Sequence, residues 1–143
     1  QPMTNIRWIS RINWHITIIF IGDFAVDFID EMNKTLKFHF LHQQAFEILF
    51  DKFCYVPNNR HPTMIWQQFH QSKKFDGLIK TTFEVLKEFY WNNHIPFNIS
   101  IREKNTAHVT LCRLKNKHIK NMAFTFLVRI VQHQKMVLVL YQQ

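Results

Sequence analysis

The stretch NWHITIIFIGDF, residues 13–24, holds a histidine and a threonine two positions apart within a run of β-branched and apolar residues. A run of this kind predicts a β-strand, here over 14–21. Side chains alternate across a strand, so His15 and Thr17 would project from the same face. Asp23, just after this run, is expected to cap a following helix.

The same His-apolar-Thr pattern returns in AHVTLCRL, residues 107–114. It predicts a second strand over 108–114, with His108 and Thr110 on one face. A single motif of this type is more often a structural histidine than a catalytic one. Two copies, each inside a strand-like run, favour a site in which two imidazoles and two hydroxyls line one pocket.

Paired histidines suit displacement at phosphorus because the unperturbed pKa of histidine lies near neutrality, so one ring can hold a proton while the other does not. A neutral imidazole takes a proton from the attacking oxygen, and an imidazolium gives one to the leaving oxygen. The hydroxyls of Thr17 and Thr110 and a nearby cation would stabilise charge on the non-bridging oxygens. This chemistry requires no metal and no cofactor.

The rest of the chain predicts further strands and two amphipathic helices. Strands are expected over 5–9, 45–56, 63–69, 124–132 and 136–141, and helices over 25–42 and 75–92. Each half would then hold one His-x-Thr strand and one long helix, an internal near-repeat of architecture. No low-complexity linker separates the halves, so we expect packed lobes of a single domain over residues 1–143.

The chain has 143 residues and a formal net charge of +8 at pH 7. This basic balance favours nucleic acid or nucleotides as partners, the alternative being a charge that only aids solubility. Cys54 and Cys112 lie far apart without CxxC spacing, which argues against a zinc cage or a disulfide framework and is typical of a reducing cytosol. No apolar run reaches the ~20 residues that span a bilayer. We therefore expect a cytoplasmic monomer with no membrane partner.

Both motifs resemble those of the two-histidine phosphoesterase superfamily, and within it the RNA 2′,3′-cyclic phosphodiesterases, also called 2′-5′ RNA ligases. RWISRINWHITIIFIGD, residues 7–23, is similar to the first family motif, and HVTLCR, residues 108–113, to the second. MIW at 64–66 is comparable with a strand that family members carry between them. The resemblance covers most of the chain from Arg7 on, and its specificity is concentrated in the two motifs.

The resemblance implies an α+β fold of two lobes, each a β-sheet backed by helices, with the His-x-Thr strands facing each other across a central cleft. It implies hydrolysis of RNA 2′,3′-cyclic phosphate ends to 2′-phosphates, and reversible joining of 2′-5′ linkages. By similarity, His15 would protonate the leaving O3′ and His108 would activate water, or the reverse. Thr17 and Thr110 would hold phosphate oxygens, and Arg113 would add a positive charge there.

Two alternatives remain open. One is a non-catalytic RNA- or nucleotide-binding domain of the same fold, against which the intact histidine and threonine of both motifs argue. The other is a superfamily phosphodiesterase with another nucleotide substrate. Family members have a strand and a helix before the first motif, whereas only fourteen residues precede His15. We therefore expect that strand and helix to be missing.

Several residues outside the motifs are candidates for RNA contact. Trp66, Tyr55 and Phe24 could stack on a base, but core packing is the favoured role for each. Lys115, Lys117 and Lys120 suit contact with an RNA backbone, with an exposed basic loop as the alternative.

Overall fold

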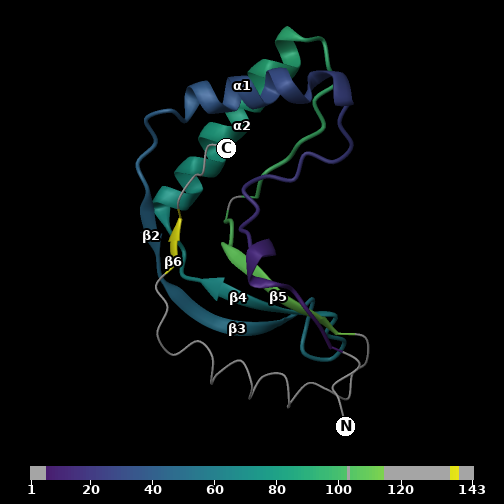
Figure 1. The fold of residues 1–143 in the computed structure, drawn as a ribbon, viewed down its shortest axis with the longest axis vertical. Helices are drawn as coiled ribbons and strands as arrows, with labels where there is room; N and C mark the ends of the chain where they lie inside the picture. Colours follow the sequence, from purple (N-terminus) through teal and green to yellow (C-terminus); the bar gives the residue numbers. More distant parts are fainter. Residues whose placement is uncertain (1–5, 103, 115–135, 139–143) are drawn as a thin grey trace. The chain divides into compact units, whose positions relative to one another are not determined.

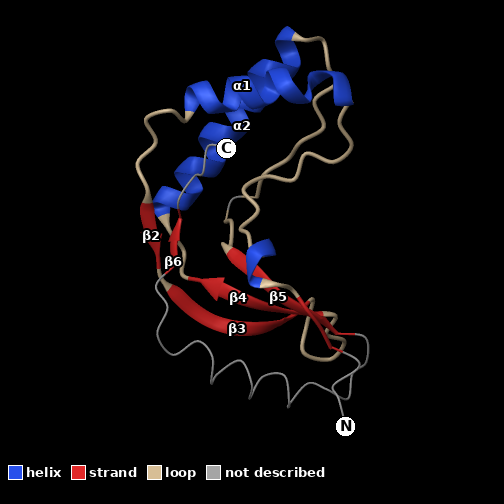
Figure 2. Ribbon diagram, viewed as in Figure 1, coloured by secondary structure: helices blue, strands red, loops and turns tan. Residues whose placement is uncertain are grey.

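The computed structural model describes residues 6–102, 104–114 and 136–138 (Figure 1). Its elements are, in chain order, β1 (Ile6–Trp8), the 3-10 turns η1 (Arg11–Asn13) and η2 (Val26–Phe28), α1 (Ile29–His39), β2 (Phe46–Ile48), β3 (Phe50–Val56), β4 (Met64–Phe69), α2 (Lys73–Asn92), β5 (His108–Leu114) and β6 (Met136–Leu138). Helices and antiparallel strands occur together, as the α+β prediction requires (Figure 2). None of the helices in the described ranges is long and apolar enough to cross a membrane.

The chain divides into two compact units. The first contains residues 1–16, 48–70 and 106–136, and the second contains residues 17–47, 71–105 and 137–143. The division falls between Ile16 and Thr17, so the two polar residues of the first motif belong to different units. The predicted cleft between two lobes stays a prediction.

The first unit contains a four-stranded antiparallel sheet in the order β1-β5-β4-β3. Burial alternates along β4, where Ile65 and Phe69 are buried and Met64 and Trp66 are half-buried. The sheet therefore has one buried face and one half-exposed face, as expected from the period of two along a strand.

A β-bulge interrupts the pairing between β4 and β5. Ile65 pairs with Cys112, but the next residue, Trp66, pairs with Thr110. Leu111 is therefore an extra residue with no partner of its own on β4. A bulge of this kind shifts the alternation of side chains along the strand by one residue.

The second unit contains α1 and α2, which pack through a small apolar core. Met32 of α1 and Leu86, Phe89 and Tyr90 of α2 form its buried centre. Ile95, after the end of α2, is among the half-buried side chains that cover this centre. The apolar stripes predicted for the two helices thus face each other, which is how amphipathic helices gain their stability.

Capping differs between the two helices. Ser72 is the N-cap of α2, and its hydroxyl accepts a hydrogen bond from the Phe75 N–H at 3.3 Å. The prediction that Asp23 caps a helix is wrong. The turn η2 begins after Ala25, and α1 follows only at Ile29.

The strand predicted over 14–21 is also wrong, and with it the prediction of one His-x-Thr strand in each half. These residues form no described strand, and Ile19 and Ile21 pack against the core of the second unit instead. Apolar alternation records which side chains are buried. A strand also needs a neighbouring backbone that satisfies its N–H and C=O groups.

The other predicted elements are confirmed wherever they are described. The strands predicted over 5–9, 45–56, 63–69 and 108–114 appear as β1, β2 with β3, β4 and β5, and the helices predicted over 25–42 and 75–92 appear as α1 and α2. The segment 136–141 is described only over its first three residues, which form β6 and pair with β2. The strand predicted over 124–132 lies outside the described residues.

Candidate active site

Three of the predicted site residues share the half-exposed face of the first unit's sheet. His108 and Thr110 are two apart on β5 and lie on one face, as predicted. On a regular strand Arg113 would point to the opposite, buried face. Because of the bulge, Leu111 and Cys112 are both buried, at 1% and 0% exposure, and Arg113 is exposed on the face of His108 and Thr110.

The His108 ring stacks on the indole of Trp66 from the neighbouring strand. The ring centroids are 3.6 Å apart and the planes meet at 15°. Trp66 lies directly opposite Thr110 in the sheet, so the indole reaches diagonally to the histidine. This contact covers one face of the imidazole and restricts the rotation of the ring.

The two motif histidines are held by the same local hydrogen bond. His15 Nδ1 lies 2.9 Å from the carbonyl oxygen of Asn13, and His108 Nδ1 lies 2.9 Å from that of Thr106. A carbonyl oxygen can only accept, so in each ring Nδ1 carries the hydrogen and donates it. Nε2 is then the atom that can take up or release a proton. The motifs therefore share a local geometry although only the second forms a strand.

The first motif is placed less completely than the second. His15 is exposed and follows η1 in the first unit, where the neighbouring Trp14 Nε1 donates to the Ile9 carbonyl at 2.9 Å. Neither a hydrogen bond nor a ring contact joins His15 and His108 within the described ranges. Thr17 belongs to the second unit, so its predicted place beside the histidines stays a prediction.

Thr17 lines an apolar cavity of about 360 Å³ in the second unit. The walls come from the chain around Thr17 and from apolar side chains of the helices, among them Met32 and Leu86. Such walls offer no charge to a phosphate, so the cavity itself does not explain a phosphate-binding role for Thr17.

The first unit is strongly basic. Its described residues include five basic side chains and one acidic side chain: Arg7, Arg11, Lys52, Arg60 and Arg113 against Asp51. The described residues of the second unit carry equal numbers of acidic and basic side chains. The positive charge noted in the sequence is thus concentrated in the unit that contains both histidines, which suits an anionic ligand.

Arg7 was not predicted as a site residue, and the structure brings it to the same surface. It lies on β1 directly opposite Arg113 on β5, and both side chains are exposed. The sequence carried a weak signal, because Arg7 opens the first motif. The pairing with Arg113 joins positions more than a hundred residues apart and cannot be read from local pattern.

The aromatic candidates have different roles. Trp66 packs on His108. It therefore lies outside the buried face of the sheet, and the face of its indole that covers His108 cannot stack on a base. Phe24 packs in the core of the second unit, 5.5 Å from the Tyr90 ring centroid, so the core-packing interpretation is confirmed for it. Tyr55 is half-buried on β3. The three lysines after β5 lie outside the described residues.

The thiols are poor candidates for nucleophiles. Cys54 and Cys112 are both free. Burial raises the pKa of the Cys112 thiol to about 11, against a smaller lowering by the backbone hydrogen bond with Ile65. Burial also raises the pKa of Cys54. Both thiols are therefore neutral near pH 7, and the thiolate is the reactive form.

Side chains suited to hold a metal do not gather in the described part of the chain. No group of three or more His, Cys, Asp or Glu residues there lies close enough to bind an ion.

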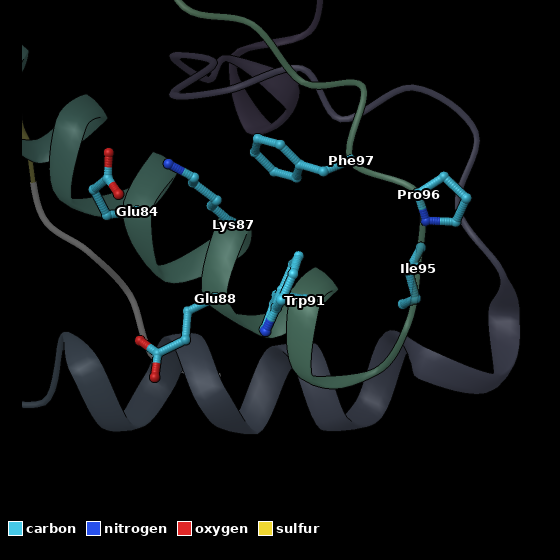
Figure 3. A pocket seen from close by; sticks show the side chains of 7 residues that line it. All are labelled: Glu84, Lys87, Glu88, Trp91, Ile95, Pro96 and Phe97. Atoms are coloured by element: carbon cyan, nitrogen blue, oxygen red, sulfur yellow. The ribbon is translucent and has the colours of Figure 1, made fainter.

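A second cavity, of about 630 Å³, lies against the C-terminal half of α2 and the segment that follows it (Figure 3). Figure 3 shows Trp91 and Phe97 lining it, with Glu84, Glu88 and Lys87 along the helix. The cavity contains no residue of either motif. Two carboxylates against one ammonium do not favour a phosphate, so we do not assign the phosphoesterase site to it.

Comparison with known proteins supports the resemblance seen in the first motif. Residues 1–66 match the model of a family described as LigT like phosphoesterase, within the two-histidine phosphoesterases. The matched stretch contains the first motif and ends at Trp66, on β4. The second motif lies beyond it. No curated protein matches the chain.

Proposed function

From the match of residues 1–66 to the LigT like phosphoesterases, we propose that the protein is a phosphodiesterase that hydrolyses RNA 2′,3′-cyclic phosphate ends to 2′-phosphates. The observation that carries the proposal is the shared anchoring of His15 and His108 by a backbone carbonyl two residues earlier. Two imidazoles held alike through Nδ1, each leaving Nε2 as the atom that exchanges a proton, suit a reaction that needs one proton taken and one given.

In the proposed reaction, His108 Nε2 takes a proton from water while the water oxygen bonds to phosphorus. The bond from phosphorus to O3′ breaks, and His15 Nε2 gives its proton to O3′. The phosphate stays on O2′, and the two histidines have exchanged protonation states. With a ribose 5′-hydroxyl in place of water, the same steps join a 2′-5′ linkage, and each histidine keeps its role. Run backwards, they cleave that linkage, and the acid and base roles reverse.

The remaining side chains would stabilise charge on the phosphate. Thr110 presents its hydroxyl on the same face as His108, and Thr17 is proposed to do so from the first motif. Arg113 has no carboxylate partner among the described residues, and its Nη1 makes only a weak contact with Met64 Sδ at 3.8 Å. Its guanidinium is therefore available to pair with a non-bridging oxygen.

Turnover of a nucleoside 2′,3′-cyclic phosphate in EDTA tests the proposal. His15→Ala and His108→Ala should each lower kcat by roughly 10²- to 10⁴-fold, since each removes one proton-transfer group. His61→Ala is a matched control, because His61 is exposed in the same unit but belongs to neither motif. It should turn over like the unchanged protein.

Product analysis separates the alternatives. A 2′-phosphate product supports the proposed bond cleavage, whereas a 3′-phosphate would retain two-histidine chemistry and contradict the assignment of the broken bond. Absence of turnover, together with retained binding of a nucleotide, would favour the non-catalytic binding domain. Turnover restricted to another cyclic nucleotide would favour a phosphodiesterase with a different substrate.

A further inference from the structure

Two arginines, Arg7 and Arg113, lie side by side on the half-exposed face of the sheet. They are near the C-terminal end of β5, whereas His108 is at its N-terminal end. Arg7 and Arg113 are directly opposite in the β1–β5 pair, so their Cβ atoms are roughly 5 Å apart. Both side chains are exposed. Like charges directly opposite on neighbouring strands repel, and this raises the free energy of the fold without a ligand.

The described residues of the first unit supply no nearby counter-charge for this pair. Asp51 is the one acidic residue among the described residues of the first unit, and it lies on β3, at the opposite edge of the sheet from β1. Three strand spacings put the two edges roughly 14 Å apart, beyond the screening length of about 10 Å at 0.1 M salt. Asp51 also accepts a hydrogen bond from Gln68 at 2.9 Å. An anion from outside this unit would neutralise the arginines.

The arginine pair lies close to the second motif. Arg113 is three residues beyond Thr110, at most roughly 10 Å along the strand, and the bulge shortens this separation. A terminal phosphate held at Thr110 and Arg113 and a second phosphate held by Arg7 would therefore be near neighbours. Successive phosphates of one nucleic-acid strand meet that requirement, because a single nucleotide links them.

We propose that Arg7, which lies beside Arg113, binds the phosphodiester next to the cyclic end, so that the site selects oligonucleotide ends over mononucleotides. The identity of the terminal group rests on the proposed function, but the anion site follows from the arginine pair alone. Arg7 is thus a substrate-binding residue, and its effect depends on whether the substrate carries a second phosphate.

The test compares two substrates with the same terminal base: a nucleoside 2′,3′-cyclic phosphate and a dinucleotide ending in that group. Arg7→Gln should lower kcat/KM for the dinucleotide by about tenfold, the usual scale for one charge-assisted contact. It should leave the mononucleotide within roughly twofold. Arg7→Lys should restore part of the preference. Arg60→Gln is the matched control, since Arg60 is an exposed arginine of the same unit outside this pair.

A binding measurement keeps this test independent of catalysis. Fluorescence anisotropy with a labelled single-stranded RNA ending in a 2′-phosphate should show weaker binding by Arg7→Gln. The slope of log K against log salt should fall by about 0.7, the value for one single-strand phosphate contact. If no form of the protein turns over either substrate, but Arg7→Gln still weakens RNA binding, the proposed function is contradicted and the arginine site is supported.

Two outcomes would overturn the arginine site. One is an equal loss for the mononucleotide and the dinucleotide in Arg7→Gln. The other is unchanged RNA affinity and salt slope together with new self-association, because Arg7 would then act only to protect β1, the edge strand of the described sheet, from pairing.

Discussion

The stacking of Trp66 on His108 gives the most direct test of how the second motif is positioned. Parallel rings 3.6 Å apart at 15° make a close face-to-face contact. An aromatic pair contributes about 0.5–1.5 kcal/mol, and a cation over an indole up to about 2 kcal/mol where water is excluded. If this energy orients the imidazole for reaction, Trp66→Leu should lower kcat by roughly 3- to 30-fold, at 1.36 kcal/mol for each factor of ten. Steady-state kinetics on a nucleoside 2′,3′-cyclic phosphate would measure it.

The matched variant is Trp66→Phe, which keeps a ring over His108. It also removes the indole Nε1, which is buried without a hydrogen-bond partner among the described residues. We expect it to retain kcat within about threefold. Because the effect concerns orientation, KM should change little in either variant. An unchanged kcat in Trp66→Leu would refute the positioning role. A rise in KM alone would show instead that the indole binds the base of the substrate.

Two further predictions concern stability and are measured by urea unfolding. Ser72→Ala removes the N-cap of α2 and should lower the free energy of unfolding by about 1 kcal/mol. Turnover should not change. A change in the free energy of unfolding below the error of the measurement would show that the 3.3 Å bond to the Phe75 N–H contributes nothing. The Cys112 thiol, with its pKa raised to about 11, keeps its proton in the folded state where an unfolded thiol, with a pKa of about 8.5, has lost it. Its contribution is therefore fully present below about pH 8.5 and is lost as the pH rises to about 11, on the order of 3 kcal/mol. Cys112→Ala should remove that part of the pH dependence, and an identical slope in both proteins would contradict the assignment.

The second motif shows how far local pattern can reach. Strict alternation around His108 and Thr110 predicted a strand, and β5 covers the predicted residues 108–114. The neighbouring strand is also predicted, over 63–69, and appears as β4. The prediction succeeds here because both strands have paired neighbours on each side in the sheet, so propensity and hydrogen bonding favour the same structure.

The first motif shows where local pattern fails. Its alternation is as regular as that of the second, yet the segment 14–21 forms no strand. Ile19 and Ile21 are half-buried against the helical core of the second unit, so their partial burial is explained without a sheet. Which backbone lies beside a segment depends on the whole fold, and period-two patterning contains no information about it.

The contacts that define the candidate site required the structure for the same reason. The stacking of Trp66 on His108 and the pairing of Arg7 with Arg113 depend on strand order and register. The sequence predicts only base stacking or core packing for Trp66, and no site role for Arg7. Residues far apart in sequence become neighbours through long-range pairing, which no local periodicity encodes.

The bulge at Leu111 also sets a rule for transplanting this surface to another protein. On a regular strand, a face carrying histidine, threonine and arginine in succession is encoded as H-x-T-x-R. Here the spacing is H-x-T-x-x-R, because Leu111 is an extra residue that shifts the alternation of side chains along the strand by one. A designer who copied the six residues onto an unbroken strand would bury the arginine and expose the cysteine. The six residues can be transferred to another protein only together with the β-bulge, because the bulge places the arginine on the same face as the histidine and the threonine.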